Sequence, residues 1–375
     1  MKKTVAQILP SLISGGVERE TIEIAKGLVK NNYKSLVISS GGSLVCEVRE
    51  NMAEHITMPV ASKNPFIIWK NVYRLQQLIK DRDIKLLHAR SRAPAWSTYY
   101  ACSKADIPFV TTVHGTYSTS PALKKIYNQI MLKGDAVIAI SHFIKNYILQ
   151  NYKVDESKIV LIPRGVDTDY FNPEAIDKET LKRFKAKYKL EESRPVILLP
   201  GRFTSWKGHE LLVQSINKIK NLDFACIMVG DDVKDKAYVK RVDNLINSYN
   251  LREKIKLFGS EHNMLYLYAI SDIVVSSSTR PEAFGRVAVE AQAMKKIVIG
   301  SNIGGSTETI IDEKTGLLFD NQNIDDLADK ISYSLKLLES RLHEEMGNNA
   351  RENVVLNYHL KQMQDQTIEV YKTLL

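Results

Sequence analysis

Short apolar runs alternate along the chain with longer segments whose apolar residues recur at helical spacing. Residues 4–10 predict a strand, and residues 17–31, with Ile22, Ala25 and Leu28 on one face, predict a helix. Further strands are predicted at 34–39, 84–88, 109–114 and 136–140, with helices at 66–80 and 94–104. Strands separated by helices predict a parallel sheet with helices on both faces.

The alternation restarts after residue 170. A basic helix is expected at 178–189, strands at 195–200, 224–229, 255–258, 273–276 and 296–300, and a last helix at 360–375. The 375 residues suit two domains, at about 100–200 residues each. The expected fold class is α/β, with two similar units in tandem, residues 1–170 and 171–357. Ligands are expected in a cleft formed by the carboxyl ends of the strands.

Charge is distributed unevenly along this chain. Residues 1–165 contain 23 Lys and Arg against 12 Asp and Glu, whereas the remainder contains 29 against 31. The excess predicts that the first half faces something anionic, either nucleic acid or an acidic membrane, or else is a solvated basic face. Residues 55–80 and 107–134 contain no acidic residue. A helix predicted at 122–133 could direct Lys124, Lys125 and Lys133 toward anionic headgroups or pack on the sheet.

Targeting and redox signals point to the cytoplasm. No apolar run approaches the ~18–20 residues of a membrane span, and the apolar stretch at the start is too short for a signal peptide. Cys46, Cys102 and Cys226 are scattered and predict neither disulfides nor a zinc site. We expect a cytoplasmic protein, with peripheral attachment to the inner face of the cytoplasmic membrane as a further hypothesis.

Two glycine-containing loops follow predicted strands. Gly15-Gly16 precedes a helix, where backbone amides favour an anion, although the spacing is neither that of a dinucleotide motif nor that of a P-loop. Gly201-Arg202 lies five residues before Lys207-Gly208. A guanidinium and an ammonium in one loop suit a diphosphate, although such a pair is also common on protein surfaces.

A third motif contains Glu282 and Glu290, eight positions apart and so about two helical turns. Glu290 falls on an otherwise apolar helix, where a carboxylate needs a partner such as a sugar hydroxyl. The loop Phe284-Gly285-Arg286 places amides at the start of that helix.

These motifs in this order resemble those of the retaining glycosyltransferases of family 4, and the resemblance covers essentially the whole chain. It implies the GT-B architecture, with two facing Rossmann-like domains and a segment 358–375 that packs back on the first of them. Arg164 departs from the pattern, since many members carry Asn there. Residues 88–96 resemble lipopolysaccharide-type members. The resemblance rests on Gly15-Gly16-Val17-Glu18, His114-Gly115, Ser141, Ile162–Asp167, Gly201-Arg202, Lys207-Gly208, Val229-Gly230, Phe258-Gly259 and the pair Glu282/Glu290.

The resemblance implies a role for each motif residue. Arg202 and Lys207 would bind the donor diphosphate, Glu282 would hold the transferred sugar, and Glu290 would bind the ribose. His114 would line the sugar site. The remaining donor-binding positions would be Gly15, Gly16, Gly230, Gly259, Phe284, Gly285 and Arg286.

The implied reaction is metal-independent transfer, with retention, from a nucleotide-sugar to a cell-envelope glycan or lipid-linked acceptor, as in lipopolysaccharide or capsule synthesis. No D-x-D motif lies where a metal would serve, so cationic side chains are expected to stabilise the leaving diphosphate. Two alternatives stay open. A sugar-nucleotide 2-epimerase would share the diphosphate site, and a non-catalytic nucleic-acid-binding protein would use the basic half, although no nucleic-acid signature accompanies it.

Overall fold

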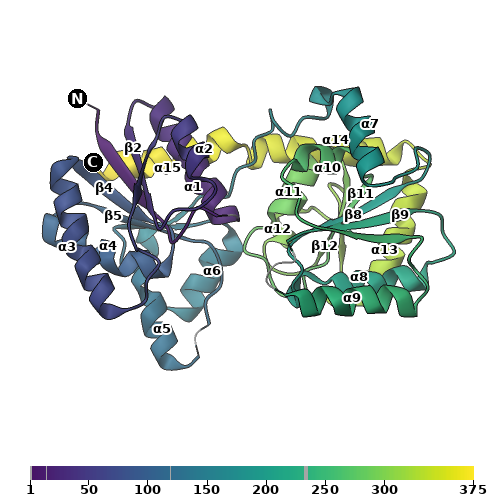
Figure 1. Cartoon of the computed structure of the whole chain (residues 1–375), viewed down its shortest axis with the longest axis horizontal. Helices are drawn as coiled ribbons and strands as arrows, with labels where there is room; N and C mark the ends of the chain where they lie inside the picture. The colour runs from purple at the N-terminus through teal and green to yellow at the C-terminus, as the bar shows by residue number, and fades with distance from the viewer. Residues whose placement is uncertain (1, 14, 119, 232–234) are drawn as a thin grey trace. The chain divides into compact units, whose positions relative to one another are not determined.

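The computed structural model describes residues 2–13, 15–118, 120–231 and 235–375. The chain forms two compact units, Met1–Gly165 with Leu360–Leu375 and Val166–His359 (Figure 1). We call them the N-unit and the C-unit. Each contains one parallel sheet with helices on both faces.

The sheet of the N-unit has the order β3-β2-β1-β4-β5-β6-β7, and every pair of neighbours is parallel. The order reverses direction between β1 and β4, which in such sheets is where ligands bind. The strands are β1 (Thr4–Ile8), β2 (Lys34–Ser39), β3 (Glu54–Thr57), β4 (Ile84–Ala89), β5 (Phe109–Val113), β6 (Ala136–Ala139) and β7 (Ile159–Leu161).

Amphipathic helices cover this sheet. The last helix, α15 (Leu360–Leu374), packs beside α1, and its residues Met363, Ile368 and Tyr371 join the core formed by β1, β4 and β5 (Figure 1). The Tyr371 hydroxyl lies 2.6 Å from Nδ1 of the buried His88. The other helices are α1 (Gly16–Lys30), α2 (Val45–Glu50), α3 (Pro65–Asp81), α4 (Arg92–Ala105), α5 (Ala122–Asn128) with the 3₁₀ turn η1 (Gln129–Leu132), α6 (His142–Asn151) and η2 (Glu156–Lys158).

The C-unit repeats the same topology with six parallel strands, in the order β10-β9-β8-β11-β12-β13. The strands are β8 (Val196–Pro200), β9 (Ala225–Val229), β10 (Ile255–Phe258), β11 (Ile273–Ser276), β12 (Ile297–Ser301) and β13 (Leu317–Phe319). The helices are η3 (Pro173–Ala175), α7 (Lys178–Lys187), η4 (Ser205–Lys207), α8 (His209–Lys218), α9 (Lys236–Ser248), α10 (Met264–Ala269), α11 (Arg286–Ala293), α12 (Ser306–Thr309), α13 (Ile324–Leu337) and α14 (Leu342–Asn357).

The predicted fold class, two Rossmann-like domains with parallel sheets, is confirmed. The predicted helix at 122–133 was wrong in its extent, because the chain tightens into η1 after Asn128. The side-chain amide of Asn128 donates from Nδ2 to the Ser118 carbonyl and accepts at Oδ1 from Arg92. As a result Ile130 and Met131 are buried, whereas Leu123 and Ile126 are exposed. Within the described ranges, no helix has the length and apolar content to cross a bilayer.

Candidate functional site

In the C-unit, the predicted residues Lys207 and Glu282 meet at the carboxyl ends of β8 and β11. Lys207 Nζ lies 2.7 Å from Glu282 Oε1, and the Ser278 hydroxyl donates to the same carboxylate. Both side chains are only 12–14% exposed. Burial alone would raise the pKa of Glu282. The charge of Lys207 and hydrogen bonds from Lys207, Ser278 and Ser276 lower it. The Glu282 carboxylate is therefore ionised at neutral pH.

The loop that carries Lys207 packs against a buried histidine, His209. His209 opens α8, and its ring stacks on Phe203 at a centroid distance of 4.5 Å. Burial, with a smaller contribution from Lys207, lowers the pKa of His209 to about 4. The imidazole is thus neutral in the folded protein at pH 7.

This histidine should make the fold sensitive to acid. Because the unfolded chain protonates His209 below its usual pKa of 6.5 whereas the folded chain does not until about 4, stability falls as pH decreases through that window. We expect a loss of up to about 3 kcal/mol from this group between pH 7 and 4.5. His209→Phe should flatten the pH dependence of the unfolding midpoint over this range. An unchanged dependence would contradict the prediction.

Gly201 and Gly230 are in direct backbone contact after β8 and β9. A Cβ built on Gly230 would lie 1.8 Å from the Gly201 carbonyl oxygen, so no side chain fits there. Arg202 follows Gly201 and is exposed. Gly259, after β10, is exposed, and nothing lies within 4 Å of its Cβ position.

Gly230 and Gly259 form a matched pair for mutation. Gly230→Ala should lower the free energy of unfolding by about 3 kcal/mol or more, because backbone must move to admit the methyl group. Gly259→Ala should change it by less than about 0.5 kcal/mol. Denaturant titration of the two variants measures the difference. Equal stabilities would show that the two strand ends are not held as closely as described.

Glu290 is held in place within α11. Its Oε1 lies 2.5 Å from Nε of Arg286, one turn earlier, and its Oε2 accepts from the Tyr268 hydroxyl at 2.9 Å. Gly285 precedes the helix with φ 90°, a conformation that favours glycine. Phe284 is buried against Tyr358, with ring centroids 5.5 Å apart. Only the backbone of Phe284 is therefore available to a ligand.

In the N-unit, Gly15, Gly16 and His114 follow β1 and β5 at the carboxyl edge of the sheet. His114 is 8% exposed in its side chain, and neither ring nitrogen has a hydrogen-bond partner among the described residues. Its Nδ1 lies 3.6 Å from Glu20 Oε2. Burial, reinforced by nearby arginines and opposed by Glu20, lowers the pKa of His114 to about 3. His114 is neutral in the folded protein at pH 7.

Glu20, Arg90 and Arg164 form a buried ionic cluster beside His114 that was not predicted from sequence. Arg90 Nη1 lies 2.5 Å from Glu20 Oε1, and Arg164 Nε lies 2.5 Å from Oε2. Although burial alone would raise the pKa of Glu20, the charges of the two arginines help to lower it to about 2. The sequence signal was weak, because Glu20 is one of several acidic residues in α1. Arg90 and Arg164 follow strands, but they stood out only through the resemblance.

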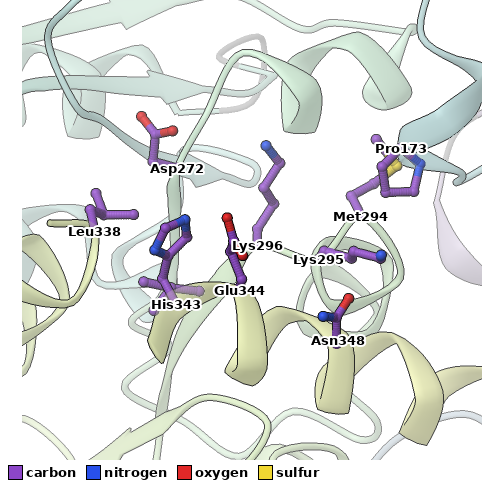
Figure 2. Close-up of a pocket in the computed structure, with 10 residues that line it drawn as sticks. Pro173, Asp272, Met294, Lys295, Lys296, Leu338, His343, Glu344 and Asn348 are labelled. Atoms are coloured by element: carbon purple, nitrogen blue, oxygen red, sulfur yellow. The ribbon is translucent and has the colours of Figure 1, made fainter. Parts of the chain in front are cut away.

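A separate pocket of about 450 Å³ lies in the C-unit where β11 and β12 begin (Figure 2). Figure 2 shows Asp272, Lys296, His343 and Glu344 around the same space. Lys296 Nζ donates to the Ala269 carbonyl at 3.4 Å, and burial lowers its pKa. Since Lys207 and Glu282 follow the opposite ends of the strands, this pocket contains none of the predicted site residues.

Comparisons with known proteins find a family match for each unit. A model described as Glycosyltransferase Family 4 matches residues 14–170, and one described as Glycosyl transferases group 1 matches residues 181–353. The crystal structure of a glycosyltransferase from Rickettsia africae ESF-5 is 45% identical, covers 100% of this chain and 98% of that chain, and superposes with a TM-score of 0.94. The chain belongs to the family 4 glycosyltransferases of the GT-B fold.

Two more distant relatives carry specific names. Anabaena Alr3699/HepE, solved in complex with UDP-glucose, is 20% identical over 99% of this chain and 100% of that chain, with a TM-score of 0.87. N-acetyl-alpha-D-glucosaminyl L-malate synthase of Bacillus anthracis is 25% identical over 308 residues, or 80% of this chain and 77% of the relative.

Proposed function

We propose that this glycosyltransferase moves a sugar from a nucleotide-sugar, with retention and without a metal, to a cell-envelope glycan or glycolipid. The buried Lys207–Glu282 pair at the carboxyl ends of β8 and β11 carries the proposal. It combines a cation suited to a diphosphate with a carboxylate suited to sugar hydroxyls. The complex of the Anabaena relative with UDP-glucose supports a uridine diphosphate sugar as the first donor to test.

The proposed chemistry follows from charge. Cleavage of the bond between the sugar and the phosphate places negative charge on the leaving diphosphate and positive character on the anomeric carbon. Lys207 and the exposed Arg202 are assigned to the diphosphate, which they would stabilise most as it departs. Glu282 would orient the sugar, and Glu290, fixed by Arg286 and Tyr268, would accept hydrogen bonds from the ribose.

A donor screen tests this proposal and its alternatives. A ligand that binds only the folded protein raises the melting temperature, so UDP-, GDP- and ADP-sugars are compared first. The donor that binds is then incubated alone and with envelope glycans, and products are analysed for epimerisation, transfer and anomeric configuration. Epimerisation without an acceptor would favour the 2-epimerase. Loss of activity in EDTA that Mg²⁺ or Mn²⁺ restores would refute metal independence.

We also propose that the N-unit docks on an anionic membrane. Its exposed aromatic residues Phe66, Trp69, Tyr73 and Tyr100, which we call the aromatic surface, lie on the packed helices α3 and α4. The Trp69 and Tyr100 rings pack edge to face at 6.1 Å, and Lys104 Nζ lies 5.0 Å above Trp69. Helix α4 contains no acidic residue, and α3 contains only Asp81, its last residue. Aromatic rings beside lysines suit the headgroup layer of an anionic membrane.

Liposome sedimentation tests this docking. Lys63 and Lys70 are exposed beside the aromatic surface, and each lysine near an anionic membrane contributes about 1 kcal/mol. We expect binding to anionic vesicles at low salt, lost at high salt and weakened at least tenfold by Lys63→Glu with Lys70→Glu. Lys178→Glu with Lys182→Glu, on the exposed face of α7, is the matched control. Equal binding to neutral vesicles, or equal effects of both pairs, would refute the docking.

A further inference from the structure

The buried cluster of Glu20, Arg90 and Arg164 carries more positive than negative charge. One carboxylate faces two guanidinium groups, and the side chains of Glu20, Arg90 and Arg164 are 5%, 1% and 11% exposed. His114 adds no charge at neutral pH, because its pKa is about 3. Glu18, at the start of α1, has its carboxylate beside the Cβ position of Gly15. An unbalanced charge with so little exposure is costly unless an anion joins it.

The two arginines differ in how fully they are used. Arg90 donates from Nε and Nη2 to Gln7 Oε1 and from Nη1 to Glu20, so all three nitrogens are engaged inside the fold. Arg164 uses Nε for Glu20 and Nη2 for the Gly16 carbonyl. Its Nη1 has no partner among the residues that the structure describes. Arg90 therefore stabilises Glu20, whereas Arg164 keeps a donor for a ligand.

The surroundings of Arg164 also suit a ligand. A Cβ on Gly16 would lie 2.7 Å from Arg164 Nη1, so the loop passes directly over the guanidinium, which would have to shift to admit a side chain. The ring of His114 is nine-tenths buried, has no hydrogen-bond partner among the described residues, and lies against the Glu20 carboxylate. Arg164, His114 and the Gly15-Gly16 loop all follow strands at the carboxyl edge of the sheet, where α/β folds bind ligands.

We propose that Arg164, positioned by Glu20, is the primary ligand of an anion site in the N-unit that takes a carboxylate or phosphoryl group. The proposal deepens the proposed function, and it has two candidate sources for the anion. One is a phosphate of a nucleotide, and the other is an anionic group on the acceptor glycan. The name of the Bacillus anthracis relative, which contains L-malate, is consistent with an anionic acceptor in this family.

Inorganic phosphate is the probe. The melting temperature of the full chain is followed against phosphate concentration at constant ionic strength, with chloride as the balancing salt. Wild type should show a saturable rise. Arg164→Asn should weaken the apparent affinity for phosphate by about ten- to a hundredfold, the effect of one charge-assisted contact. Arg164→Lys should fall between, because it keeps the charge but loses the fork.

Arg82→Asn is the matched control. Arg82 is also an ion-paired arginine of the N-unit, 3.0 Å from Glu54, but it precedes β4 at the opposite edge of the sheet. Its variant should bind phosphate like wild type. Far-ultraviolet circular dichroism without phosphate shows whether each variant is folded. No saturable rise in wild type, or equal affinities in Arg164→Asn and wild type, would overturn the proposal.

A repeat with saturating UDP separates the two sources. If UDP competes for the part of the phosphate response that Arg164→Asn removes, the anion is a nucleotide phosphate, whereas independent binding identifies a group of the acceptor. Failure of every nucleotide to raise the melting temperature would refute the proposed donor. The phosphate titration would still decide the anion site, so the two proposals can fail separately.

Discussion

Lys207→Ala should lower the rate of sugar transfer by about 10²–10³-fold, the usual cost of removing one group that stabilises charge in a transition state. The Lys207 side chain is 14% exposed and its ammonium lies 2.7 Å from Glu282, so it is fixed before substrate arrives. Its removal also leaves the Glu282 carboxylate with only serine donors. We therefore expect turnover to fall more than donor affinity, as steady-state kinetics with a range of donor concentrations would show.

Lys218→Ala is the control for this measurement. Lys218 is ion-paired with Asp325 at 2.9 Å on the exposed face of α8, within the same unit. Its loss should leave turnover within about twofold of wild type, as expected of an exposed ion pair. Activity of Lys207→Ala close to wild type would exclude the assigned diphosphate site. A variant that no longer folds would be recognised from its circular dichroism spectrum.

Glu20→Ala should destabilise the protein by about 3–5 kcal/mol, because it leaves two buried arginines without their shared counter-ion. Glu54→Ala removes the partner of Arg82, but that pair is about half exposed, and its loss should cost at most about 1 kcal/mol. Denaturant titration, followed by a probe in the N-unit, compares the two. Equal destabilisation would contradict the buried cluster.

The stabilising contribution of the Glu20 carboxylate should depend on pH only in acid. Since the pKa of Glu20 is about 2 in the folded protein and near 4.5 in the unfolded chain, its contribution is complete above pH 4.5 and is lost as pH falls toward 2. The difference in stability between wild type and Glu20→Gln should shrink over that window. A constant difference from pH 5 to pH 2.5 would show that ionisation of Glu20 contributes nothing.

The fold was predictable because both sheets are built from buried apolar strands with clear turn residues between them. Short strands were missed where this signal is weak. β3 contains the polar sequence Glu-His-Ile-Thr, and β7 and β13 have three residues each. These segments become strands because each pairs with a neighbouring strand, and their own apolar pattern does not indicate it.

The site was only partly predictable. Motif order indicated Lys207 and Glu282, and the structure brings them together, although their roles stay predictions. The Glu20 cluster could not be predicted, because it joins a residue of α1 to residues that follow β4 and β7, at positions 20, 90 and 164. A single sequence carries no record of such a distant pairing.

The position of α15 has a consequence for synthesis on the ribosome. This helix completes the core of the N-unit, where Tyr371 is fully buried against His88, yet it follows the entire C-unit in the chain. Domains generally fold as units while the chain emerges. Here the C-unit can complete its fold during translation, whereas the N-unit, although made first, must wait with an open apolar surface until its last helix has left the exit tunnel.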